Sequence, residues 1–180
     1  MVAGFPLALQ ADAAELEPWA KGAQSPFILP AVEGADVALA APHDGIVLVH
    51  FFATWCEPCR EELPALARFA NRGGSSVKVL AISVAEVDGR VQRFVASMPV
   101  TFPVLLDRDR GVARSWQVAT LPTTFVLDAD LNPRLFVETD YAWDLVDPKK
   151  LIAASGVVGP DLLTAAAHQA GQEEATHAHQ

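Results

Sequence analysis

Long apolar runs along the chain alternate with stretches in which apolar residues recur at helical spacing. The runs at 45–54 and 77–85 are nearly continuous and rich in β-branched residues, which is typical of buried strands in the centre of a sheet. Helical periods occupy 57–74, which closes at a Gly-Gly pair, and 88–98. The other elements expected are a short strand or hairpin in SPFILPAVEG (25–34), a strand at 102–107, a helix at 110–118, a hairpin at 123–139, and a helix at 147–155 that Asp147 caps.

This order of elements predicts one α/β domain with a mixed central β-sheet and helices on both faces. We place the domain at 25–158, between an N-terminal extension at 1–24 and an Ala-rich C-terminal tail at 159–180. The extension contains a short apolar stretch followed by Ala11-Asp12-Ala13, like the cleavage site of an export signal, but no basic residues precede it. It is therefore either a flexible leader or the remnant of an export signal.

The composition narrows the range of partners. The chain has 180 residues and a net charge of -9, which argues against nucleic acid as a partner because phosphate binding needs a basic face. The sequence has no apolar run of about 18 residues that would predict a membrane span. A structural zinc is not expected, because the sequence has no second CxxC and its histidines form no HxxxH pair. The three histidines of the tail are expected to be solvated: His168, His177 and His179.

Both cysteines lie in the stretch TWCEPCR, directly after the first central strand and at the start of the first helix. Free N–H groups and the dipole at a helix N-terminus stabilise a thiolate, so Cys56 is expected to be the attacking sulfur. Cys59 lies one turn further and can close a disulfide with it. Two other interpretations stay open at this point, in which the pair binds a metal or the cysteines are structural thiols.

The segment FFATWCEPCREELPAL (51–66) resembles the thioredoxin superfamily, and within it the TlpA/ResA/DsbE branch of extracytoplasmic thiol:disulfide oxidoreductases, many of which serve cytochrome c maturation. The segment VATLPTTFVLD (118–128) is similar to the cis-proline loop of that family. The resemblance covers roughly 25–155 and implies a thioredoxin-like fold, with an incoming peptide paired to the backbone of Leu121. The substrate-binding residues implied are Trp55, Glu57, Pro58, Leu121 and the cis residue Pro122.

Two further residues become candidates through the resemblance. Glu86 follows the second central strand, where the branch has an acid that acts as proton acceptor or pKa tuner for the dithiol; the alternative is a solvated loop glutamate. His50 is a departure, because it lies six residues before Cys56, where the family has a buried Asp or Asn. It is either a core histidine with a satisfied hydrogen bond or a titratable group coupled to Cys59.

The resemblance implies an enzyme that exchanges thiols and disulfides with protein substrates. We expect a reductant in the periplasm, with a part in cytochrome c or copper-site assembly and a membrane-bound dithiol reductase as its electron donor. No organic cofactor or metal is expected beyond the redox-active disulfide of Cys56 and Cys59. A cytoplasmic thioredoxin is the alternative location.

Other classes of protein share this fold. A peroxide-reducing enzyme usually places its cysteine in a Pro-x-x-x-Thr-x-x-Cys setting, which this sequence lacks. A copper-handling protein would use CxxxC and a distant histidine, whereas this chain has CxxC. A thioredoxin-like binding module without redox turnover would tolerate loss of a cysteine or of the proline loop, and both are present here.

Overall fold

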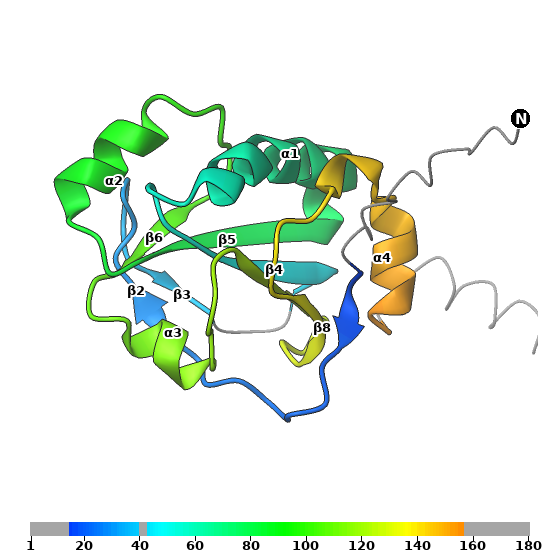
Figure 1. Ribbon diagram of the computed structural model, residues 1–180. Coiled ribbons are helices and arrows are strands. Elements are labelled where there is room, and N and C mark those ends of the chain that lie inside the picture. Colours follow the sequence, from blue (N-terminus) through cyan, green and yellow to red (C-terminus); the bar gives the residue numbers. More distant parts are fainter. Residues whose placement is uncertain (1–14, 40–42, 157–180) are drawn as a thin grey trace, which may run out of the picture.

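A mixed six-stranded sheet forms the centre of the computed structural model, which describes residues 15–39 and 43–156 (Figure 1). The strand order is β1-β8-β7-β4-β5-β6. The strands of this sheet are β1 (Glu17–Pro18), β4 (Ile46–Phe52), β5 (Val77–Val84), β6 (Val104–Asp107), β7 (Thr123–Leu127) and β8 (Pro133–Val137). A separate hairpin joins β2 (Ile28–Leu29) to β3 (Val37–Ala38). The helices are α1 (Glu57–Gly73), α2 (Asp88–Val95), α3 (Gly111–Ser115) and α4 (Pro148–Ala154), with 3-10 turns η1 (Gly74–Ser76) and η2 (Trp143–Leu145).

The central position of β4 in the sheet explains why the residues on both of its faces are apolar. It pairs in parallel with β5 and antiparallel with β7, so neither of its edges is free, and all of its residues are buried. Strand β6 extends the parallel part of the sheet beside β5, and β8 extends the antiparallel part beside β7. The expected mixed sheet is therefore confirmed.

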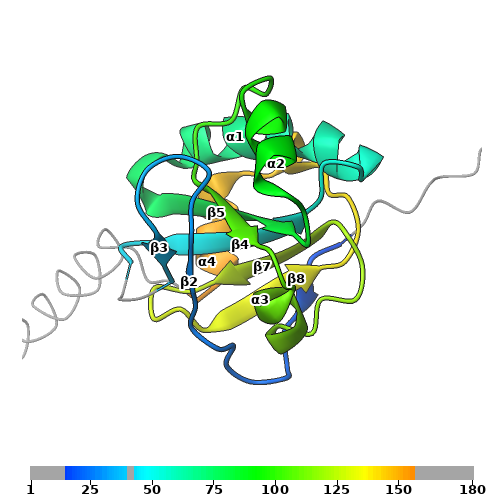
Figure 2. The same ribbon diagram turned by 90° about the vertical axis from the view of Figure 1, so that its left-hand side faces the viewer.

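Helices cover both faces of the sheet, as the order of elements predicted. Residues Ile46 and Leu48 of β4 pack with α1 and α4, and Phe52 packs with α1 and α2. The alternate β4 residues Val47 and Val49 point to the opposite face, where Trp116 after α3 and the β2–β3 hairpin cover them. Figure 2 shows α1 and α2 on one side of the sheet and α3 on the other.

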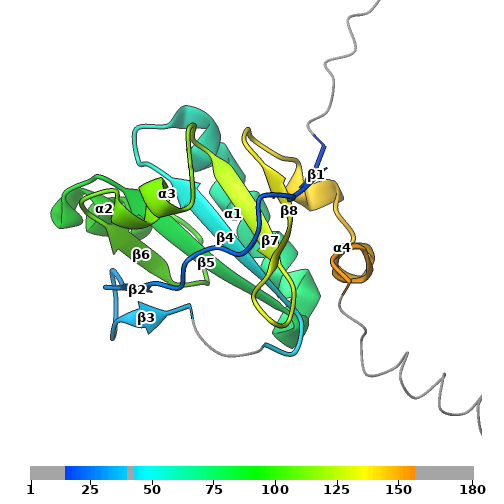
Figure 3. The same ribbon diagram turned by 90° about the horizontal axis from the view of Figure 1, so that it is seen from below.

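The N-terminal boundary that we expected at residue 25 is wrong, because residues 15–24 already belong to the domain. Strand β1 pairs with the outer edge of β8, and Trp19 packs edge-on against Phe125 at 5.0 Å and Phe136 at 5.2 Å between ring centres. Figure 3 shows this segment running along the sheet towards β2. The rest of the expected leader, at 1–14, and the tail at 159–180 with His168, His177 and His179 lie outside the described residues.

Helix α1 begins as its sequence predicts. Cys56 is the N-cap, Pro58 lies in the first turn, where a missing N–H costs nothing, and Pro64 lies within the helix. Its buried face carries Cys59, Glu62, Leu63, Leu66, Ala67 and Phe69. Among the described residues, no helix combines the length and the apolar character needed to cross a membrane.

Candidate active site

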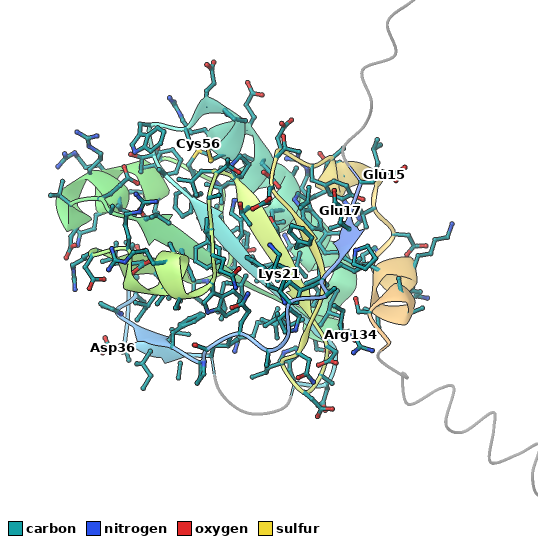
Figure 4. All side chains as sticks on the ribbon, turned by 60° about the horizontal axis from the view of Figure 1, so that its bottom comes forward. Glu15, Glu17, Lys21, Asp36, Cys56 and Arg134 are labelled. Carbon is teal, nitrogen blue, oxygen red and sulfur yellow. A yellow bond between two sulfur atoms is a disulfide. The ribbon has the colours of Figure 1, made fainter. Side chains whose placement is uncertain are left out.

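The two cysteines form a disulfide between the N-cap and the first turn of α1 (Figure 4). Their Cα atoms are 5.3 Å apart, which is an ordinary separation for a disulfide. Cys56 retains 6% of its exposure, whereas Cys59 retains 0%. An incoming thiol or disulfide can therefore reach Cys56 first, and Cys59 is shielded behind it.

The start of α1 provides one backbone donor for the sulfur of Cys56. The amide of Cys59 donates to Cys56 Sγ at 3.3 Å, and the positive end of the helix dipole points towards the same sulfur. Both effects favour a thiolate at Cys56 once the disulfide is reduced. The flanking carboxylate of Glu57 is exposed and works against them by charge repulsion.

Glu86 holds the loop that leads into the cysteines. Its carboxylate accepts hydrogen bonds from the amide and the hydroxyl of Thr54, at 2.8 and 2.5 Å, and from Ser83 Oγ at 2.8 Å. The residue is 9% exposed, so it is not the solvated loop glutamate of the alternative interpretation. These contacts give Glu86 a positioning role for the loop before Cys56, and its role as proton acceptor stays a prediction.

An apolar pocket lies beside the disulfide and contains two of the expected substrate-binding residues. The pocket has a volume of about 450 Å³ and is lined by Trp55 and Leu121, together with residues that follow β5, precede α3 and lead into β7. Leu121 also packs against the cluster that contains both cysteines, and its peptide bond to the buried Pro122 is cis. Trp55 is 67% exposed, as expected of a surface aromatic, whereas Trp116 lies in the core at 0%.

His50 lies on β4, on the face of the sheet that α1 covers. On that face its neighbour along the strand is Phe52. The ring of His50 stacks on Phe52 at 6.2 Å, and Phe52 packs with both cysteines. His50 Nδ1 is hydrogen-bonded to Thr124 Oγ1 at 2.9 Å, while its Nε2 has no partner among the described residues. Complete burial lowers the pKa of His50 to about 3, so the ring is neutral at physiological pH. The histidine is thus only half satisfied, and its coupling to Cys59 stays a prediction.

The structure adds a residue that the sequence analysis overlooked, the buried carboxyl of Glu62. It lies three residues after Cys59 and therefore on the same face of α1. Glu62 Oε1 accepts a hydrogen bond from Trp143 Nε1 in η2, and Oε2 has no partner among the described residues. Desolvation raises the pKa of Glu62 from 4.5 to about 8, although the bond from Trp143 opposes the shift.

A signal for Glu62 was present in the sequence. Residue 62 falls four positions before Leu66 and three after Cys59, so the helical period alone places it on the apolar face of α1. Trp143, its partner, is 81 residues away in the chain and could not be paired with it by pattern.

In the described part of the chain, no three His, Cys, Asp or Glu side chains are grouped so that they could hold a metal ion, and the absence of a metal stays a prediction. The sulfurs of Cys56 and Cys59 are bonded to each other, which leaves no thiolate ligand in this oxidised form. The chemistry that the site supports is making and breaking of this disulfide.

The architecture and the CxxC site together define a thioredoxin-like protein. The fold matches that of a candidate thiol:disulfide interchange protein DsbE from Chlorobium tepidum, with a TM-score of 0.64 and 25% identity over 76% of this chain and 98% of that one. Residues 22–132 match the AhpC/TSA family, and the chain belongs to that family. The resemblance to ResA- and DsbE-type proteins inferred from the two motifs is thereby confirmed.

Named relatives agree with this placement. The chain is 35% identical to the thiol-disulfide oxidoreductase ResA of Bacillus subtilis over 112 residues, which are 61% of this chain and 63% of ResA. It is 30% identical to the sporulation thiol-disulfide oxidoreductase A of the same organism over 133 residues, 71% of this chain and 76% of that protein. For ResA and other relatives at 32% to 35% identity, the match spans only 63% to 65% of the relative's length.

Proposed function

We propose that this protein is a thiol:disulfide oxidoreductase that acts on the disulfides of partner proteins. The observation that carries the proposal is the Cys56–Cys59 disulfide at the N-terminus of α1, with Cys56 outermost and an apolar pocket beside it. In the reduced protein, the Cys56 thiolate attacks a substrate disulfide and releases one substrate thiolate. Cys59 then attacks Cys56 Sγ, which re-forms the disulfide and releases the second substrate thiolate. Two electrons pass to the substrate.

The surroundings of the dithiol favour the reducing direction. Cys59 is fully buried among apolar side chains, and the exposed carboxylate of Glu57 lies within one turn of it. Burial and neighbouring carboxylates both disfavour a thiolate. The helix start therefore stabilises a thiolate at Cys56 alone, and a dithiol in which only one thiol gains this stabilisation keeps a low reduction potential and gives up its electrons readily.

The decisive measurement is the reduction potential of the Cys56–Cys59 pair. The protein is equilibrated against dithiothreitol or glutathione mixtures, and the alkylated thiols are counted by mass spectrometry. We expect a value near that of thioredoxin, about -270 mV, or lower. A value near about -120 mV would make the protein a disulfide donor instead. If no disulfide forms at any potential, the oxidoreductase itself is refuted.

Cysteine variants test the assignment of the two sulfurs. Cys59→Ser should accumulate a mixed disulfide with a peptide substrate at Cys56, because the resolving thiol is missing. Cys56→Ser should accumulate little, since Cys59 is buried. The opposite pattern would exchange the two roles. Peroxide consumption is measured in parallel, and turnover comparable to that on peptide disulfides would favour the peroxide-reducing class.

The proposal extends to the place of action. The ResA/DsbE resemblance supports an extracytoplasmic location, where a membrane-bound dithiol reductase would recharge the oxidised protein and the substrates would include proteins of cytochrome c or copper-site assembly. Cell fractionation of the source organism, with the redox state of Cys56 trapped by acid, tests this. Protein found in the cytoplasm, and reduced there by the thioredoxin system, would contradict it.

A further inference from the structure

Trp55 separates two hollows in the surface beside Cys56. Its side chain lines both the larger pocket of about 450 Å³ and a smaller one of about 230 Å³. Ala85, in the loop after β5, also lines both. Because Trp55 is 67% exposed, it forms a ridge with a hollow on either side. A polypeptide that brings a disulfide to Cys56 across this ridge would therefore place neighbouring residues in both pockets.

Each pocket carries one arginine. Arg110, the N-cap of α3, is the one charged residue in the lining of the larger pocket, which is otherwise apolar except for Thr120. Arg90, on α2, lines the smaller pocket together with Glu86 and the exposed Val87. The Glu86 oxygens are already occupied by hydrogen bonds from Thr54 and Ser83.

Neither arginine has an ion-pair or hydrogen-bond partner for its guanidinium within the described ranges 15–39 and 43–156. The acids next to Arg110 are engaged elsewhere, since Asp107 accepts from backbone amides of α3 and Asp109 accepts from the amide of Gly111. The exposed Glu57 beside Cys56 lines neither pocket. The arginines that do form ion pairs are Arg68, Arg72, Arg108 and Arg134.

Two arginines without an ion pair thus lie beside the site, in a chain whose net charge is -9, with 22 acidic and 13 basic residues. A guanidinium offers several N–H donors in a plane, which matches a carboxylate. The apolar lining of the larger pocket matches an aliphatic or aromatic side chain. The larger pocket thus offers an apolar surface, and the arginine of each pocket offers a binding group for a carboxylate.

We propose that the preferred substrates are protein segments that carry an acidic residue and an apolar residue close to the reactive cysteine, with the carboxylate bound by Arg110 and a second acid on the other flank bound by Arg90. The proposal rests on the proposed oxidoreductase function and names the substrate class of the same site. Exposed ion pairs are weak, and at about 1.4 kcal/mol for each tenfold change in rate they correspond to a two- to fivefold preference.

The experiment uses three peptides that differ at a single position two residues from their disulfide-bonded cysteine, which carries Glu, Gln or Lys. The reduced full-length protein is mixed with each peptide, and the second-order rate constant of the single turnover is followed by release of a fluorescent thiol. The same rates are measured for Arg110→Gln, Arg110→Glu and Arg90→Gln. Arg93→Gln is the matched control, because Arg93 is also an exposed arginine of α2, lines neither pocket and forms no ion pair within the described residues.

The wild type and Arg93→Gln should prefer the Glu peptide over the Gln peptide by two- to fivefold at low salt, and the preference should shrink at about 0.5 M salt, where screening is strong. Arg110→Gln should lose most of the preference, and Arg110→Glu should prefer the Lys peptide. Equal rates for all three peptides with the wild type, or an unchanged preference in Arg110→Gln, would overturn the substrate class while leaving the oxidoreductase function intact. Failure of the wild type to reduce any peptide would overturn both.

Discussion

Replacing Glu62 with Gln tests the central electrostatic feature of the site. The side chain of Glu62 is 4% exposed, and one of its oxygens accepts the indole N–H of Trp143. Glutamine has the same shape as the protonated acid, and its carbonyl can accept the same hydrogen bond. The substitution therefore removes the ionisation and little else, and we expect it to stabilise the oxidised protein above neutral pH.

The size of the effect follows from the pKa of Glu62. Burial raises it from 4.5 in the unfolded chain to about 8 in the folded protein, so between these values the folded state holds a proton that the unfolded state has lost. Stability from this group is complete below pH 4.5 and falls as the pH rises to 8. At about 1.4 kcal/mol per pH unit the loss is at most about 5 kcal/mol, and relaxation of the site reduces it to about 2 to 4 kcal/mol.

His50 contributes with the opposite sign. Its pKa falls from 6.5 to about 3 on folding, so stability from this group rises with pH between those values. The two slopes largely cancel between pH 4.5 and 6.5, because there the unfolded chain holds a proton on His50 and the folded protein holds one on Glu62. Considering these two groups alone, the free energy of unfolding should rise below pH 4.5, level off, and fall between pH 6.5 and 8. Glu62→Gln should lose the fall and rise up to pH 6.5.

The assay is urea unfolding of the oxidised protein at half-unit steps of pH, with the wild type and Glu62→Gln compared at each step. Glu61→Gln is the control, because Glu61 is the neighbouring residue of α1, carries the same formal charge and is exposed. It should leave the shape of the pH profile unchanged. Identical profiles for the wild type and Glu62→Gln between pH 6.5 and 8 would show that Glu62 is ionised in the folded state, and the argument from burial would fail.

Three further substitutions probe the backbone around the site, each checked by denaturant unfolding. Glu86→Ala leaves both donors of Thr54 without their acceptor and should cost about 2 to 4 kcal/mol and slow peptide reduction; unchanged activity would argue against a positioning role. Ala85 has a φ of 58°, so Ala85→Val should cost about 1 to 2 kcal/mol while Ala85→Gly is tolerated, and equal stabilities would contradict the strain. Gly45→Ala would place a methyl group against the Ser76 carbonyl oxygen and should cost about 3 kcal/mol; a neutral result would mean that the loop moves aside.

The parts of the fold that the sequence predicted are those in which local pattern and tertiary role agree. Strand β4 reads as a buried strand because both of its faces are covered, and α1 reads as a helix because its apolar face follows the helical period. Strand β1 could not be predicted, since two residues, one of them proline, carry no period. Its existence depends on the free edge of β8 and on Trp19, which finds its aromatic partners over a hundred residues away.

In the candidate site, too, the local features were predicted from the sequence and the long-range contacts were not. The order strand, CxxC, helix is local, and it placed Cys56 at the N-cap and Cys59 behind it as the structure does. The contacts of Glu86 with Thr54 and of Glu62 with Trp143 join segments that are 32 and 81 residues apart. The spacing of residues along the sequence cannot predict contacts over such distances. Polar residues are usually read as solvated, and these two acids are exceptions because the fold supplies them with donors.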